Sequence, residues 1–135
     1  MAKTTVRGLK GRKQVYHAVY DFNIDGGTSA SALEMFSLKA GTIVHGFWLE
    51  VEAAIVGTLS TVELGDSSDP DGILAQIAEA SLPANFVSGS SHEGAYLTGG
   101  LRKKFASDAS IEMLIGTADL TAGKLHFYLE CSDGY

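Results

Sequence analysis

Apolar and polar side chains alternate along most of this chain, with the period of two that a half-buried β-strand requires. The first clear run of this kind, residues 15–22, places Tyr16, Tyr20 and Phe22 on one side. Segments rich in residues that favour turns separate the runs, as at residues 23–29. The pattern predicts strands at residues 15–22, 33–38, 42–55, 58–64, 95–105, 111–117 and 124–131.

The strongest predicted strand, residues 42–55, has one apolar face and one polar face. The apolar face is formed by Ile43, Phe47, Leu49, Val51 and Ala53, and His45 shares it. Trp48, Glu50 and Glu52 fall on the other face. An exposed tryptophan is unfavourable unless something covers it, so we expect these three side chains to lie at an interface. Gly46 marks the position of a β-bulge.

One segment departs from the strand pattern and predicts a short helix. Apolar positions within residues 73–78 are spaced like one face of a helix, and Asp71 is available as its N-cap. Turns at Gly57 and at residues 118–123 predict two hairpins. Seven or eight short strands with turn signals about every ten residues predict an all-β fold, an antiparallel jelly-roll-like β-sandwich.

Charge divides the chain into two parts. The 135 residues suffice for only one core, which we expect to be a β-sandwich domain over residues 15–135. The basic residues before it predict an extended N-terminal arm over residues 1–14. The basic residues of the arm are Lys3, Arg7, Lys10, Arg12 and Lys13. They give the arm a net charge of +5, whereas the remainder carries 5 bases against 16 acids, a net charge of −11.

The opposite charges suggest what the arm does. We expect it to lie across an acidic neighbouring protein, such as another copy of this chain. Solvated disorder is the alternative. Binding of nucleic acid is disfavoured, because the acidic remainder would repel phosphates and no aromatic residue is interleaved with the bases.

The motifs of several common enzyme classes are missing from the sequence. It contains no Gly-x-Ser-x-Gly elbow and no P-loop, and its single cysteine and four histidines lack the spacing of a zinc site. We expect no catalytic residues, no cofactor and no metal, and we assign no role to His17, His45 or His126. No apolar run approaches the roughly 18 residues that span a bilayer, so we expect a soluble, unexported protein without membrane association.

An acidic loop at residues 66–71 leaves one alternative open. Asp66, Asp69 and Asp71 offer the oxygen ligands that Ca²⁺ prefers, although their spacing is not that of an EF-hand. With the loop at residues 88–96 they would suit a lectin-like, carbohydrate-binding β-sandwich. The plainer interpretation is a turn whose aspartates accept hydrogen bonds from backbone amides.

The junctions between the predicted strands carry a series of short motifs. They are Tyr20-Asp21-Phe22, Asp25-Gly26-Gly27, Leu38-Lys39-Ala40-Gly41, Trp48, Val51-Glu52, Gly57-Thr58, Leu64-Gly65-Asp66, Asp69-Pro70-Asp71-Gly72-Ile73-Leu74 and Leu120-Thr121-Ala122-Gly123. This series resembles that of head decoration, or cement, proteins of tailed bacteriophages. The resemblance covers about residues 15–130, and this chain departs from it at Lys39, where proline is common, and in its long basic arm.

The resemblance implies a non-enzymatic virion structural protein. Such a protein would bind the major capsid protein on the outer surface of the head, after assembly in the cytoplasm of the bacterial host. It would also bind itself, as a homotrimer in preference to a homodimer. A fibre or tail component and a lectin-like module are the alternatives.

Overall fold

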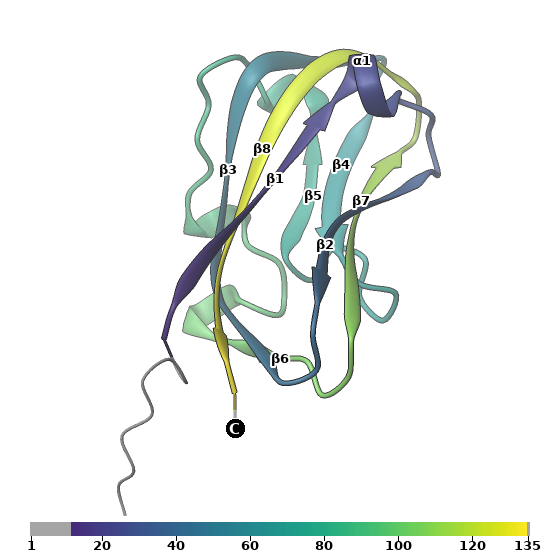
Figure 1. Ribbon diagram of the computed structural model, residues 1–135. Helices are drawn as coiled ribbons and strands as arrows, with labels where there is room; N and C mark the ends of the chain where they lie inside the picture. The colour runs from purple at the N-terminus through teal and green to yellow at the C-terminus, as the bar shows by residue number, and fades with distance from the viewer. Residues whose placement is uncertain (1–11, 135) are drawn as a thin grey trace, which may run out of the picture.

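Two antiparallel sheets of four strands each form the sandwich of the computed structural model, which describes residues 12–134 (Figure 1). The first sheet contains, in spatial order, β1 (Gln14–Asp21), β8 (Leu120–Asp133), β3 (Thr42–Gly57) and β6 (Lys103–Lys104). The second contains β2 (Ala32–Leu38), β7 (Ala109–Gly116), β4 (Thr61–Gly65) and β5 (Leu74–Ala78). Single helical turns are α1 (Phe22–Asp25), η1 (Glu79–Ser81), η2 (Ser90–His92) and η3 (Thr98–Gly100). This architecture confirms the predicted antiparallel β-sandwich.

The last strand, β8, lies in the middle of the first sheet. It pairs with β1 along the whole of β1, from Gln14 opposite Cys131 to Asp21 opposite Lys124. On its other side it pairs with β3. The free edge of β3 is covered by the segment at residues 82–88, whose backbone bonds to β3 include the 2.9 Å bond from the amide of Val51 to the carbonyl of Phe86.

The core lies between the two sheets and takes inward side chains from both. It is closed mainly by aliphatic residues of β3, β7 and β8, with two phenylalanines in contact at its centre. Phe47 and Phe127 have ring centroids 6.1 Å apart. Fully buried members include Tyr20, Val44, Leu49, Val62, Leu64, Ile73, Leu74, Leu82, Ile111, Met113, Ile115, Leu125, Phe127 and Leu129.

Bulges change which residues of β3 face the core. The register with β8 shifts between Val44 and Gly46, which confirms the predicted bulge at Gly46. Because the bulge inverts the alternation before it, Val44 is fully buried and the predicted inward residue Ile43 is only half-buried. Further shifts around Ala53 expose that residue, so its predicted inward position is also wrong.

The predicted helix at residues 73–78 is wrong, because this segment contains β5. Leu74 and Ile77 are both buried although they are three residues apart. They pair with Leu64 and Val62 of β4, with a bulge between the two pairs. A bulge in a strand thus produced the three-residue spacing that helices also show.

The two predicted hairpins are also wrong. β3 and β4 belong to different sheets, as do β7 and β8, so the turns that follow β3 and β7 cross from one sheet to the other. A strand alternates in the same way whether the next strand along the chain pairs with it or lies in the opposite sheet. The sequence therefore did not distinguish a hairpin from a crossing between sheets. Phe22 begins α1 and does not end a strand, and the weak strand predicted at residues 95–105 is reduced to β6.

Candidate binding surfaces

A row of aromatic rings crosses the outer face of the first sheet. Tyr128 of β8 stands directly opposite His17 of β1 and Trp48 of β3 in the strand register. Its ring stacks on both, with centroid separations of 4.7 Å to His17 and 5.0 Å to Trp48. We call this surface, with His126 beside it, the aromatic face. Val15 and Val19 of β1 are also exposed.

A chain of hydrogen bonds connects the aromatic face to Glu52. Nε2 of His126 lies 2.7 Å from Oε1 of Glu52, and Nδ1 of His126 lies 2.7 Å from Nε2 of His17. Since an ionised carboxylate only accepts, His126 donates to Glu52, and the Nδ1 of a neutral His126 ring then accepts from His17. The hydrogen bond from His126, followed by that from Lys124, lowers the pKa of Glu52.

The structure places Trp48, Glu50 and Glu52 on the outward side of β3, as the alternation predicts. Trp48 is half-buried beneath its stacking partner, while Glu50 and Glu52 are exposed. Sequence reasoning missed His17, His126 and Tyr128. A signal was present, because His126 and Tyr128 alternate with buried residues of β8, but nothing local indicated that the first and last strands pair.

Half-buried His45 sits apart from this row. Its Nε2 lies 2.6 Å from the hydroxyl of Ser132, while its Nδ1 is buried and has no hydrogen-bond partner within the described residues. Burial, followed by nearby positive charge, lowers the pKa of this histidine. We assign the histidine a structural role.

The predicted basic arm lies largely outside the described residues. Lys3, Arg7 and Lys10 belong to that part, whereas Arg12 and Lys13 are described and exposed. The ammonium of Lys13 lies 3.5 Å from a carboxylate oxygen of Glu130 on β8. The binding role of the arm stays a prediction.

Acidic side chains gather on the outer face of the second sheet. Glu34 of β2 stands directly opposite Glu112 of β7, and Glu63 of β4 points outward between buried neighbours. None of the four strands of this sheet contains Lys or Arg. Burial, followed by the charges of Asp71 and Asp69, raises the pKa of Glu63. We call this surface, with the loop at residues 66–71, the acidic face.

Within that loop the three aspartates hold the turn and one another. One oxygen of Asp66 accepts hydrogen bonds from the amide of Asp69 at 2.9 Å and from the hydroxyl of Tyr96 at 2.8 Å. A hydrogen bond between the carboxyl groups of Asp69 and Asp71 raises the pKa of Asp69. Among residues 12–134, no three Asp, Glu, His or Cys side chains are grouped as metal ligands. The geometry is that of an aspartate-capped turn.

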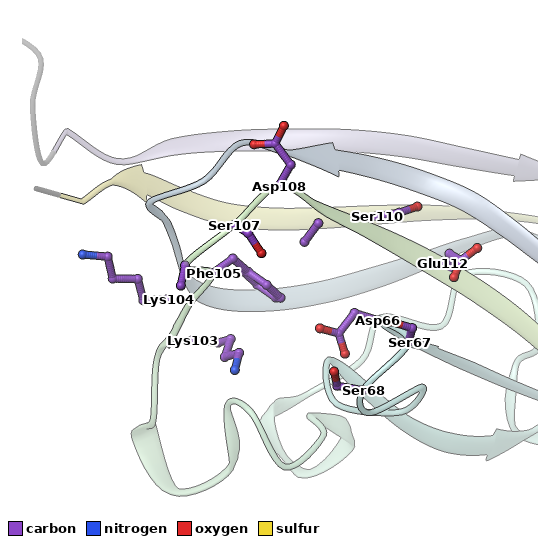
Figure 2. Close-up of a pocket in the computed structure, with 12 residues that line it drawn as sticks. Asp66, Ser67, Ser68, Lys103, Lys104, Phe105, Ser107, Asp108, Ser110 and Glu112 are labelled. Carbon is purple, nitrogen blue, oxygen red and sulfur yellow. The ribbon is translucent and has the colours of Figure 1, made fainter.

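A groove runs beside this loop, at the end of the acidic face. Figure 2 shows its main part, about 360 Å³, with Asp66 to Ser68 on one side and the segment from Lys103 to Glu112 on the other. A smaller hollow of about 110 Å³ shares Asp66, Ser67 and Glu112 with it. The hollow is otherwise lined by Ala32, Gly65, Pro70 and Leu114.

Two lysines, Lys103 and Lys104, also line the groove. The ammonium of Lys103 lies 4.5 Å from the ring centre of Tyr96 and 5.5 Å from that of Phe105. An ammonium group in this position is attracted to the electron-rich face of the aromatic ring. Of the aspartates predicted to bind a ligand, Asp66 alone lines the groove, and the loop at residues 88–96 does not line it.

Comparison with solved structures gives the fold a context. A chain of the cyanophage Pam1 capsid asymmetric unit matches with a TM-score of 0.68 and 18% identity, over 98% of this chain and 92% of that chain. A chain of the Ralstonia phage GP4 capsid matches with a TM-score of 0.63 and 16% identity, over 99% and 92%. This protein shares their fold.

A third capsid gives the same result. A chain of the acid-stable capsid of Helicobacter pylori bacteriophage KHP30 matches with a TM-score of 0.62 and 12% identity, over 92% of this chain and 90% of that chain. No family model and no curated protein matches the sequence. Across the described residues, no helix has the length and apolar character needed to cross a membrane.

Proposed function

We propose that this protein is a virion structural protein, a decoration subunit that binds the outer face of a phage head shell. The observation that carries the proposal is the extent of the structural likeness. In three phage capsids the matched chain is covered almost completely by this one, and the reverse also holds. The likeness is therefore to a whole small subunit and not to a domain of a larger shell protein.

The aromatic face supports a role in protein–protein contact. Tryptophan and tyrosine supply much of the binding energy at protein interfaces. Here Trp48 and Tyr128 are stacked and held in place by strand pairing, with exposed Val15 and Val19 beside them on β1. We assign this face to the major capsid protein.

Many weak contacts would suffice for such a subunit. A homotrimer that touches two or more shell proteins gains affinity from multivalency without a large interface on each copy. The expected site is the outer surface of a head assembled in the host cytoplasm. No chemical step is required of any residue.

Co-sedimentation of the full-length protein with undecorated head shells tests the proposal. We expect the protein to pellet with shells of the phage whose genome encodes it. Trp48→Ala and Tyr128→Ala should each weaken this binding about tenfold or more, a loss of about 1.4 kcal/mol. Gln76→Ala, an exposed change on the outer side of β5, is the matched control and should bind normally.

Two results would contradict the proposal. One is the absence of co-sedimentation with shells that are otherwise intact. The other is binding of a glycan that requires Ca²⁺ and is lost in Asp69→Asn and Asp71→Asn, because that result would indicate a lectin.

A further inference from the structure

We propose that the groove at the end of the acidic face binds, at its small hollow, the basic N-terminal segment, residues 1–12, of a second copy of this chain. The inference rests on the homo-oligomer of the proposed function and names the surface that joins its subunits. It assigns the acidic face to contacts between copies and leaves the aromatic face for the shell.

Charge is the first argument. The described residues include all sixteen acids of the chain but only seven of its bases. The ion pairs Lys13–Glu130 and Lys124–Glu52 lie on the first sheet. The strands of the second sheet carry three acids and no base. Lys103 and Lys104 line the larger part of the groove, whereas the lining of the small hollow includes Asp66 and Glu112 and no base. Residues 1–12, with four bases and no acid, complement the acidic strands and the hollow.

The repulsion within the acidic face is the second argument. Glu34 and Glu112 stand directly opposite each other, and like charges in that position destabilise a sheet. The pKa of Glu63 is raised by burial and by the nearby aspartates. A bound cationic segment would offset the repulsion between Glu34 and Glu112 and the effect of the aspartate charges on Glu63, so we expect the surface to gain stability when the subunits associate.

The shape of the groove is the third argument. Its small hollow has an apolar lining from Ala32, Pro70 and Leu114, with carboxylates of Glu112 and Asp66 beside it. Lysine and arginine bury their apolar stems along such surfaces and keep their charged ends at a carboxylate. The larger part of the groove, with serines along both sides, offers hydroxyl groups to an extended backbone.

The direction in which the arm leaves the domain favours a second copy as its source. Gln14 pairs with Cys131, near the end of β8, and Lys13 is held at Glu130. The described chain therefore starts on the first sheet, at the end of the sandwich where β8 ends, as Figure 1 shows. The main part of the groove is lined in part by β6 of the first sheet, but the small hollow lies between strands of the second sheet. To reach the hollow, an arm of the same copy would have to reverse around the end of the sandwich.

Charge reversal in the full-length chain tests the pairing. Sedimentation velocity should show that Arg7→Glu with Lys10→Glu weakens self-association about tenfold or more, and that Glu34→Lys with Glu112→Lys does the same. A chain carrying all four reversals should associate again, and so should an equimolar mixture of the two double variants. Glu50→Lys with Glu79→Lys, the same charge change outside the acidic face, is the control and should associate normally.

Disulfide trapping tests the source of the arm. Full-length Lys10→Cys and Ser67→Cys chains, mixed and oxidised, should form a covalent heterodimer, because the native Cys131 is buried. The chain carrying both changes should form oligomers linked between chains. A predominantly intrachain disulfide in that variant would overturn the proposal, as would normal self-association of either double charge variant.

Shell binding separates this inference from the proposed function. If the charge variants lose self-association as expected and the wild-type protein never binds shells, the groove assignment stands and the decoration role fails. If all variants associate normally and bind shells, the groove assignment fails and the decoration role stands.

Discussion

Glu112→Lys should stabilise the isolated subunit although it removes a residue of the groove. Glu112 lies opposite Glu34 in the register of β2 and β7 and is half-buried, so the two carboxylates repel each other. Cross-strand charge pairs contribute roughly 0.2–1 kcal/mol, with the opposite sign for like charges. Reversing one charge replaces repulsion by attraction, so we expect the free energy of unfolding to rise by about 0.5–1.5 kcal/mol.

Urea unfolding, monitored at protein concentrations at which the wild-type protein is monomeric, measures this change. Glu34→Lys should give a similar gain, whereas the variant with both lysines should lose most of it, because two ammonium groups then face each other. The midpoint of thermal unfolding should follow, with a rise of roughly 2–6 °C for either single variant. Additive stabilisation in the double variant would refute the reasoning, and so would a single variant that is less stable than wild type at low salt.

Three other changes test separate parts of the structure. Gly65→Ala should cost about 1–3 kcal/mol in urea unfolding, because its Cβ would overlap the backbone of Asp69 and Pro70, and an unchanged midpoint would contradict this. Leu59→Asn should stabilise the protein by about 0.5–1 kcal/mol, since Leu59 is 80% exposed and has a φ of 58°, and a loss of stability would count against it. Burial raises the pKa of Tyr20 to about 12, above its ordinary value of 10.0, so stability present below pH 10.0 should be lost as the pH rises through about 12. The pKa of Tyr96 is also raised to about 12, first by burial, so phenolate absorbance should show late ionisation of both residues, and Tyr20→Phe should remove only the part due to Tyr20.

The sequence predicted the strands well because alternation is a local property. Residues 111–117 and 124–131 correspond to β7 and to most of β8 within a few positions. The errors arose where the same local pattern of residues is compatible with two different structures. A bulge placed Leu74 and Ile77 on one side at a helical interval, and the turn after Gly57 leads to the opposite sheet.

The binding surfaces were predictable only in part, since they depend on pairing between distant strands. The outward position of Trp48 follows from the alternation of β3 alone. Its stacking partner Tyr128 lies 80 positions later and reaches it only because β8 pairs with β3. The acidic face required the pairing of β2 with β7, and no local pattern places Glu34 opposite Glu112.

The central place of β8 has a consequence for biosynthesis. Because β8 lies between β1 and β3 and pairs with both, the first sheet cannot form until β8 has been translated. Sheets built from such distant segments fold slowly, on a timescale of about milliseconds to seconds. A product truncated before Leu120 would expose two unpaired strand edges and lack half of the aromatic row. The topology thus lets only chains that contain β8 fold and join an assembly.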